Sequence, residues 1–169
     1  MSRTVCLVTA RMASARCPGK ALLELLPKEP LLAVLIARMR TSKTVDEVAL
    51  ATSLNPENDA IADLGRSLGI RVFRGEEDDV LKRHIGAAWA FDANTLVRVT
   101  GDNPLTDVGT MDALVKLHHE RNADYTYVPG EALLMGILAE VISSDALETS
   151  WNEGEPKHRS ELVTLYIKE

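Results

Sequence analysis

The sequence predicts an α/β fold with a mostly parallel sheet, and two observations support this. Short apolar, β-branched segments alternate with longer helical segments through most of the 169 residues. Polar loops (10–20, 52–55 and 101–107) directly follow predicted strands. In parallel sheets, ligands bind at the carboxyl ends of strands. The chain is therefore expected to hold a ligand at that edge, with right-handed crossovers between its strands.

The predicted strands are short runs rich in Val, Ile, Leu and Thr. They are Thr4–Thr9, Glu47–Thr52, Ile70–Phe73, Thr95–Thr100, Tyr125–Val128 and Gly136–Ile142.

Capping signals set the helix boundaries. Asn55 suits an N-cap with Pro56 at the first helical position, and Gly69 suits the end of that helix. The first two predicted helices are 31–40, after Pro30, and 56–68. The next two are capped by Asp78 or Asp79 and by Asp107, and run to Phe91 and Glu120. A fifth is capped by Ser143 or Ser144 and runs to Trp151, and after a linker a last helix is predicted over 157–169.

The composition limits the class of partner. The formal net charge is −6 and the pI is about 5.3, which disfavours general binding to nucleic acid or an anionic membrane. No apolar run reaches the roughly 18 residues that span a bilayer. Cys6 and Cys17 lack metal or redox spacing, so a cytoplasmic protein with free thiols is expected.

The N-terminal segment has the opposite charge. Residues 1–23 contain four cations and no acid. Such a segment is also typical of a mitochondrial transit peptide. That alternative is less favoured, because Thr4–Thr9 resembles a buried strand and Pro18-Gly19 would break a targeting helix.

The loop Ala10–Lys20 (ARMASARCPGK) is suited to phosphates. Arg11 and Arg16 offer paired donors, Lys20 offers a mobile charge, and Ser14 adds a hydroxyl. Gly19 lets backbone N–H groups approach an anion closely. The alternative is a solvated loop with scattered cations.

This loop does not fit known phosphate-loop fingerprints. A P-loop would need Gly at the position of Ser14 and Ser or Thr at that of Ala21. The chain contains no GxGxxG motif, so a Rossmann dinucleotide site is unsupported.

The segment Val99–Asp107 (VTGDNPLTD) is a second candidate. Asp102 follows Gly101 at the end of a strand, where a carboxylate can bind Mg²⁺ beside phosphates. An Asx turn explains Asp102 equally well on the motif alone. For Asp107, a helix N-cap is the favoured interpretation. The acidic segment Phe73–Arg83 is most simply the start of a helix.

Four motifs in order resemble one family. ARMASARCPGK, ATSLNPENDAI, VFRGEEDDVLKR and VRVTGDNPLTD are similar to segments of cytidylyltransferase-like spore-coat polysaccharide biosynthesis proteins, relatives of acylneuraminate and 3-deoxy-manno-octulosonate cytidylyltransferases. The resemblance covers about Thr4–Tyr125. It implies a Rossmann-like three-layer sandwich, the nucleotidyltransferase fold of the glycosyltransferase-A type.

The resemblance also implies a reaction, in which a sugar or sugar acid attacks CTP and releases pyrophosphate. It implies that Arg11, Arg16 and Lys20 hold the triphosphate, with Ser14, Gly19 and Gly101 nearby. Ala10, Thr52 and Ser53 would line the base and ribose pocket. Asp102 would bind Mg²⁺, the expected cofactor, and Arg11, Lys20 and Asp102 would be the catalytic residues.

The C-terminal part departs from the family pattern. Where PRGLDVEVFS is usual, Leu134–Ser143 reads LMGILAEVIS, so Met135 replaces Arg and Leu138 replaces a metal-binding Asp. Glu140 is retained and is the other carboxylate that could reach a metal. Leu162 and Leu165 replace a His and a Pro. The division expected is a nucleotide-binding core, 1–128, and a shortened acceptor-side segment of the same domain, 129–169.

Two alternatives remain. A nucleotide- or nucleotide-sugar-binding relative without catalysis, with a regulatory or scaffolding role, would explain these departures. A glycosyltransferase of the same fold is disfavoured because the sequence has no D-x-D motif that follows a strand. The acceptor sugar and the preference for CTP over other nucleotides stay open. Relatives often form homodimers, but the sequence leaves the oligomeric state open too.

Overall fold

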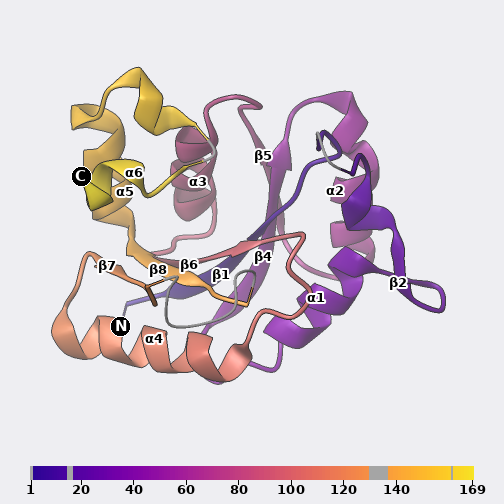
Figure 1. Ribbon diagram of the computed structural model, residues 1–169, viewed down its shortest axis with the longest axis horizontal. Coiled ribbons are helices and arrows are strands. Elements are labelled where there is room, and N and C mark those ends of the chain that lie inside the picture. The colour runs from indigo at the N-terminus through magenta and orange to yellow at the C-terminus, as the bar shows by residue number, and fades with distance from the viewer. Residues whose placement is uncertain (1, 15–16, 130–136, 161) are drawn as a thin grey trace.

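The central element of the protein is a six-stranded sheet (Figure 1). The computed structural model describes residues 2–14, 17–129, 137–160 and 162–169. The sheet strands are β1 (Thr4–Thr9), β4 (Glu47–Ser53), β5 (Val72–Gly75), β6 (Thr95–Thr100), β7 (Tyr125–Thr126) and β8 (Glu140–Ser143). Within the described residues, no helix is long and apolar enough to cross a membrane.

The strand order is β5-β4-β1-β6-β8-β7. The pairs β5–β4, β4–β1 and β1–β6 are parallel, whereas β8 runs antiparallel to β6 and to β7. The fold prediction of a mostly parallel sheet is therefore confirmed. Because β8 lies between β6 and β7, the segment 129–169 contributes a strand to the same sheet as residues 1–128.

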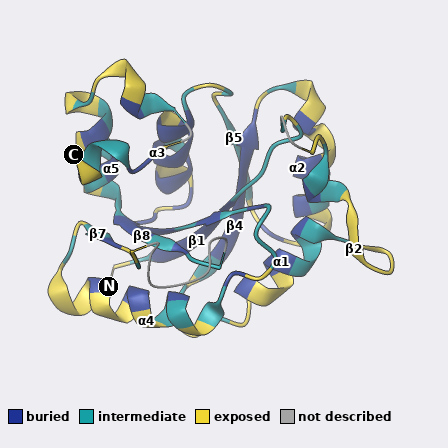
Figure 2. Ribbon diagram, viewed as in Figure 1, coloured by how far each residue is buried: buried dark blue, intermediate teal, exposed yellow. Residues whose placement is uncertain are grey.

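Helices cover both faces of the sheet, giving three layers (Figure 1). One core joins α1 (Leu31–Met39), α2 (Asp59–Ser67) and α4 (Val108–Arg121) to alternate strand residues such as Val97 and Val99. The opposite core joins α3 (Val80–Ala90) and α5 (Ser144–Glu153) to residues such as Leu96. The strands lie at the centre of the buried region (Figure 2). β6 is thus buried on both faces, and its alternate residues face different cores.

Most predicted boundaries are close to the observed ones. Asp79, Asp107 and Ser143 accept hydrogen bonds from backbone N–H groups as N-caps of α3, α4 and α5. Asn55 is also an N-cap, but the first turn after it is a 3-10 helix, Pro56–Asn58, before α2 begins. Of the predicted strand 136–142, β8 keeps the C-terminal half, and residue 136 lies outside the described residues.

Two parts of the prediction fail. A small hairpin, β2 (Glu24–Leu26) with β3 (Glu29–Pro30), was absent from the prediction. The helix predicted over 157–169 is wrong: the described residues there form a 3-10 helix, Pro156–Arg159, and α6 (Leu165–Lys168). Between them Val163 and Thr164 are buried. Burial of these side chains outweighs the local preference for a continuous helix.

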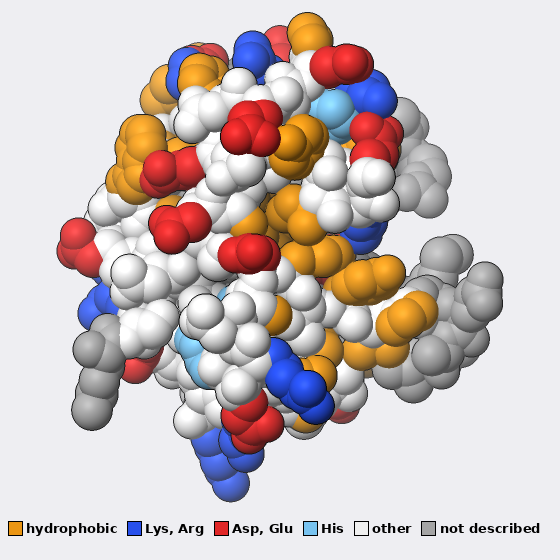
Figure 3. Space-filling view, turned by 90° about the vertical axis from the view of Figure 1, so that its left-hand side faces the viewer, with side chains coloured by type: hydrophobic (Ala, Val, Ile, Leu, Met, Phe, Trp, Pro, Cys, Tyr) orange, Lys and Arg blue, Asp and Glu red, His pale blue; other side chains and the backbone are white. Residues whose placement is uncertain are grey.

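The face that carries α5 and the C-terminal end shows acidic side chains spread among hydrophobic ones, with several cations beside them (Figure 3). Exposed acids there include Asp145, Glu153, Glu155 and Glu169. The cations considered next lie elsewhere, around the carboxyl ends of β1 and β6.

Candidate nucleotide site

A cavity of about 490 Å³ lies where β1 and β6 end and α3 begins. Ala10, Arg11, Ser14, Lys20, Gly101 and Asp102 all line it, so the structure brings these predicted site residues together. The remaining lining residues are Thr9, Ala13, Ala21, Val80, Arg83, Arg98, Thr100 and Leu162. A cavity at this edge of a parallel sheet is the usual ligand position in such folds.

The loop after β1 is folded back on itself. Gly19 has φ of 71°, in the left-handed region that suits glycine, and its N–H donates to the Met12 carbonyl at 3.0 Å. The N–H of Met12 donates to Asn58 Oδ1 at 2.7 Å. Ser14 Oγ accepts from the N–H of Cys17 at 3.4 Å. The Met12 contact holds the loop against the 3-10 helix that precedes α2, and Lys20 lines the cavity.

Gly101 lets the ends of β1 and β6 approach closely. Its N–H donates to the Thr9 carbonyl at 2.7 Å. A Cβ at position 101 would lie 2.7 Å from that carbonyl oxygen and 2.8 Å from the Ala10 Cβ. Glycine is therefore required for the contact that places the loop Ala10–Lys20 beside Asp102.

Lys20 and Asp102 form an ion pair across the cavity, in which Lys20 Nζ donates to Asp102 Oδ2. Both side chains are partly exposed, at 27% and 35%. Burial acts to raise the pKa of Asp102, but the hydrogen bond and the charge of Lys20 outweigh it, and the pKa lies below its usual value. The carboxylate is therefore ionised at neutral pH and available to a cation.

Arg83 lines the opposite wall, and the sequence interpretation did not identify it as a site residue. It is 4% exposed, and its Nη1 donates to the carbonyls of Glu76 and Glu77 at 2.5 and 3.2 Å. Burial lowers the pKa of Arg83; the charge of Arg11 lowers it further, against the raising effect of Glu77. Two guanidinium groups thus lie near each other, which favours an anion in the cavity.

Arg98, the other unpredicted lining cation, is held by Glu140. The two residues are paired across β6 and β8, and Arg98 Nη1 donates to Glu140 Oε2 at 2.5 Å. A lone Arg between Val97 and Val99 in an otherwise apolar strand was the available sequence signal. Glu140, predicted as a possible metal ligand, lies outside the residues that line the cavity. Metal binding by Glu140 stays a prediction.

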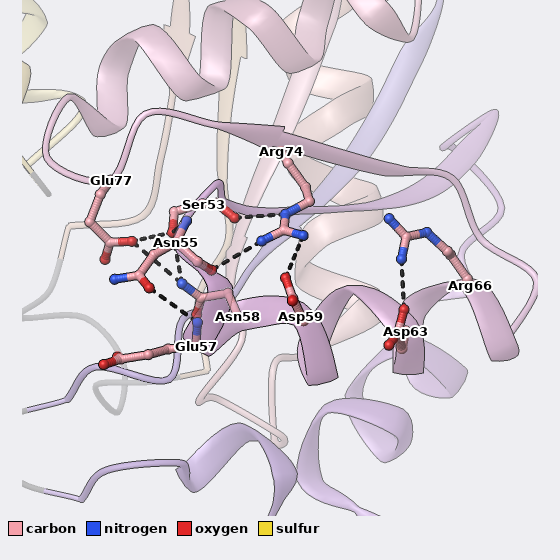
Figure 4. Close-up of polar contacts among 9 residues, drawn as sticks. All are labelled: Ser53, Asn55, Glu57, Asn58, Asp59, Asp63, Arg66, Arg74 and Glu77. Atoms are coloured by element: carbon pink, nitrogen blue, oxygen red, sulfur yellow. Dashed lines mark hydrogen bonds and ion pairs between the residues drawn. The ribbon is translucent and has the colours of Figure 1, made fainter.

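Thr52 and Ser53 are placed differently from the other predicted residues. Both are fully buried at the end of β4, and neither is among the described residues that line the cavity. Asn58 Nδ2 donates to Ser53 Oγ at 2.7 Å, and Ser53 Oγ donates to Glu77 Oε2 (Figure 4). The contacts of Ser53 lie in the loop between β4 and α2, and Asn58 of this loop accepts from the N–H of Met12 in the loop Ala10–Lys20.

The other predicted positions divide into two groups. Arg16 and Met135 lie outside the described residues. Leu138 is half-buried just before β8, and Leu162 lines the cavity with 59% of its surface exposed. Within the described residues, no group of three His, Cys, Asp or Glu side chains could hold a metal ion.

The fold and the cavity define an α/β protein with a cavity lined by cationic side chains at the carboxyl edge of a mostly parallel sheet. The family model described as cytidylyltransferase matches residues 5–169. The chain therefore belongs to the cytidylyltransferase family, and the predicted resemblance is confirmed.

Individual relatives agree with this assignment. An uncharacterized protein of Methanocaldococcus jannaschii is 39% identical over 163 residues, covering 96% of this chain and 66% of the relative. The spore coat polysaccharide biosynthesis protein SpsF of Bacillus subtilis is 35% identical over 173 residues, covering 99% and 71%. The chain thus spans about two thirds of the length of these curated relatives.

Solved structures show the same fold. A cytidylyltransferase from Leptospira borgpetersenii has a TM-score of 0.92 and 26% identity, covering 99% of this chain and 71% of that one. A CMP:2-keto-3-deoxy-manno-octonic acid synthetase complexed with CTP has a TM-score of 0.75 at 18% identity, covering 99% and 86%. The latter likeness concerns the fold alone.

Proposed function

We propose that this protein transfers CMP from CTP to a sugar-type acceptor, in polysaccharide or glycan biosynthesis. An acceptor oxygen would form a bond to the α-phosphorus of CTP, and the bond from that phosphorus to the β-phosphate oxygen would break. Pyrophosphate leaves, and the acceptor's hydroxyl proton is released to solvent. Membership of the cytidylyltransferase family and the names of its relatives support this activity.

The observation that carries the proposal is the convergence of Arg11, Lys20 and Asp102 on one cavity. A triphosphate needs several cationic donors, and Arg11 and Lys20 extend from the loop that follows β1. These cations would orient the leaving pyrophosphate and neutralise its charge. Positioning and charge stabilisation supply most of the catalysis in phosphoryl-type transfers.

Asp102 fits a role as Mg²⁺ ligand. Its lowered pKa keeps it ionised, it is partly exposed, and Mg²⁺ is commonly bound by one or two carboxylates together with substrate phosphates. Bound there, Mg²⁺ would neutralise phosphate charge. Asp102 itself would orient the metal-bound nucleotide, while Lys20 exchanges its carboxylate partner for a phosphate.

The activity is tested by incubating the protein with CTP, Mg²⁺ and a panel of sugar acids and sugar phosphates, and measuring pyrophosphate. Release with one acceptor is expected, and release with none would contradict the proposal. Calorimetric titration with CTP, ATP, GTP and UTP, with and without Mg²⁺, would identify the base. CTP should bind most tightly.

A second candidate is a nucleotide-binding protein without turnover. It is favoured by Leu162, an exposed apolar side chain in the cavity wall, and by Leu138 in place of the family's carboxylate. It predicts CTP binding without pyrophosphate release by the unmodified protein. It further predicts that Leu138→Asp is needed for turnover, so robust activity of the unmodified protein would exclude it.

We also propose a cytoplasmic location and a homodimer. Cys6 and Cys17 are free thiols, which suits a reducing compartment. Light scattering on the purified protein would measure the mass in solution, and a mass near the 18.5 kDa of one chain would contradict the dimer.

A further inference from the structure

Glu140 is the centre of a part-buried polar network beside the cavity wall. Its two carboxylate oxygens have separate partners. Oε2 accepts from Arg98 Nη1 at 2.5 Å. Oε1 accepts from Tyr125 OH, from Thr164 Oγ1 at 3.2 Å and from Lys168 Nζ at 3.1 Å. One oxygen therefore faces the cavity wall, and the other faces the C-terminal segment.

Arg98 is a charged residue in β6, a strand that is otherwise largely buried. In β6, Val97 and Val99 are buried on one face, while Leu96, Arg98 and Thr100 alternate onto the face covered by α3. Arg98 extends from there into the cavity wall, where Arg11, Lys20 and Arg83 also lie. A guanidinium among like charges needs a compensating carboxylate, and Glu140 supplies it.

The Glu140 carboxylate is firmly ionised. Burial acts to raise its pKa, but the charges of Arg98 and Lys168 and the hydrogen bond from Tyr125 outweigh it and lower the pKa to about 2. Only 17% of the side chain is exposed. A part-buried, multiply bonded carboxylate of this kind fixes the orientation of its arginine partner, which an exposed ion pair does not.

We propose that Glu140 is a positioning residue, which holds the Arg98 guanidinium in the cavity wall so that Arg98 binds the anionic ligand. This role differs from the metal binding predicted for Glu140 from the sequence. It rests on the proposed function only in taking the ligand to be a nucleotide. Arg98 is the binding residue, and Glu140 acts through it.

The sign of one substitution distinguishes this role from simple electrostatics. Glu140→Gln removes a negative charge near an anion site, so unspecific electrostatics alone predicts tighter anion binding. If Glu140 positions Arg98, the guanidinium loses its fixed orientation and binding weakens. We expect the affinity for CTP and for inorganic tripolyphosphate to fall about tenfold.

The dependence on Arg98 is tested by a double-mutant cycle. Arg98→Met should weaken the binding of both probes at least as much as Glu140→Gln. The double variant should bind no more weakly than Arg98→Met alone, because Glu140 then has no guanidinium to hold. Additive losses would indicate that Glu140 acts on the fold in general and would overturn the proposal.

Substitution on the opposite side of the carboxylate provides the matched control. Lys168→Met removes a partner of Oε1 but leaves the contact between Arg98 and Oε2. Probe binding should change less than about twofold, since Lys168 is exposed and outside the cavity. If Glu140→Gln fails to fold, Glu140→Asp keeps the charge but shortens the side chain, and should also weaken binding.

Tripolyphosphate keeps this test separate from the proposed function. A protein that binds tripolyphosphate but shows no preference for CTP would contradict cytidylyl transfer and leave the role of Glu140 measurable. Unchanged or tighter tripolyphosphate binding by folded Glu140→Gln and Glu140→Asp would overturn the positioning role, whatever the nucleotide preference.

Discussion

Lys20 and Asp102 are ion-paired across the cavity although they are 82 residues apart in the sequence. One belongs to the loop after β1 and the other follows β6, and these strands are adjacent in the sheet. Each charge is also the one that the proposed reaction requires: the ammonium for a phosphate and the carboxylate for a metal. A phosphate bound to Lys20 would free the Asp102 carboxylate for the metal, and a metal bound to Asp102 would free Lys20 for a phosphate. Nucleotide and metal are therefore expected to favour each other's binding.

Asp102→Asn should uncouple the two ligands. Without Mg²⁺, CTP should bind more tightly than to the unmodified protein, because Lys20 loses its carboxylate partner. Addition of Mg²⁺ should then have no effect on the CTP affinity, and pyrophosphate release should fall about 100-fold. Calorimetry with and without Mg²⁺ measures the first two effects.

Asp107→Asn is the matched control. Asp107 lies in the same motif but caps α4, where its Oδ2 accepts from the N–H of Thr110 at 2.6 Å. Asn is an equally good N-cap, so stability and CTP binding should both be retained. A Mg²⁺ effect lost in Asp107→Asn but kept in Asp102→Asn would reverse the assignment.

Lys20→Met should weaken CTP binding about 10- to 100-fold, because a charge-assisted phosphate contact is removed while the methylene stem is kept. The affinity should also become less dependent on salt. Lys43→Met, at an exposed position that is not among the residues lining the cavity, is the control and should leave binding unchanged. Equal CTP affinity in Lys20→Met and the unmodified protein would place the triphosphate elsewhere.

Sequence alone predicted the part of the site that follows directly from strand ends. In parallel strands the carboxyl ends meet at one edge, so the sequence alone places Arg11, Lys20 and Asp102 together. Caps such as Asp79 and Asp107 were also predictable, because their signal is local.

The remaining features depend on contacts that no local pattern encodes. Arg98 lines the cavity because β8 returns antiparallel beside β6 and sets Glu140 opposite it. Thr52 and Ser53 are fully buried, which depends on how the loop before α2 packs, and their place in the base pocket stays a prediction. The helix predicted over 157–169 failed because buried Val163 and Thr164 interrupt it. Tertiary packing decided each case.

Gly101→Ala should destabilise the protein by about 1–3 kcal/mol, because the new Cβ would meet the backbone oxygen of Thr9 at 2.7 Å. Backbone cannot move aside as a flexible side chain can. The free energy of unfolding, from urea titration, measures the effect.

Gly109→Ala is a control of opposite sign. At position 109, in the first turn of α4, the nearest atom to a new Cβ is Asp107 Oδ2 at 3.4 Å. Alanine should fit and stabilise the helix by about 0.5–1 kcal/mol. Destabilisation of equal size in both variants would show that the approach of β1 to β6 is not the cause.

His84 should make stability depend on pH. It is fully buried in α3, and burial, with a smaller contribution from the charge of Arg98, lowers its pKa from 6.5 to about 3. In the unfolded chain the His84 imidazole therefore becomes protonated near pH 6.5, whereas in the folded protein it stays neutral at that pH. The contribution of neutral His84 to the free energy of unfolding is fully present above pH 6.5. It falls as the pH decreases toward 3, by at most about 1.4 kcal/mol per pH unit.

Between pH 5 and 6 the effect of His84 on stability can be measured separately from that of Glu140. The lowered pKa of Glu140 gives a stability contribution that is lost only below about pH 4.5. His118, whose pKa is also lowered, chiefly by burial, adds to the slope with the same sign. In urea titrations, His84→Leu should therefore reduce the slope between pH 5 and 6 by about 1 kcal/mol per unit without abolishing it. Between pH 7 and 8 the two proteins should have the same slope, and equal slopes between pH 5 and 6 would show that His84 takes up its proton in the folded state as well.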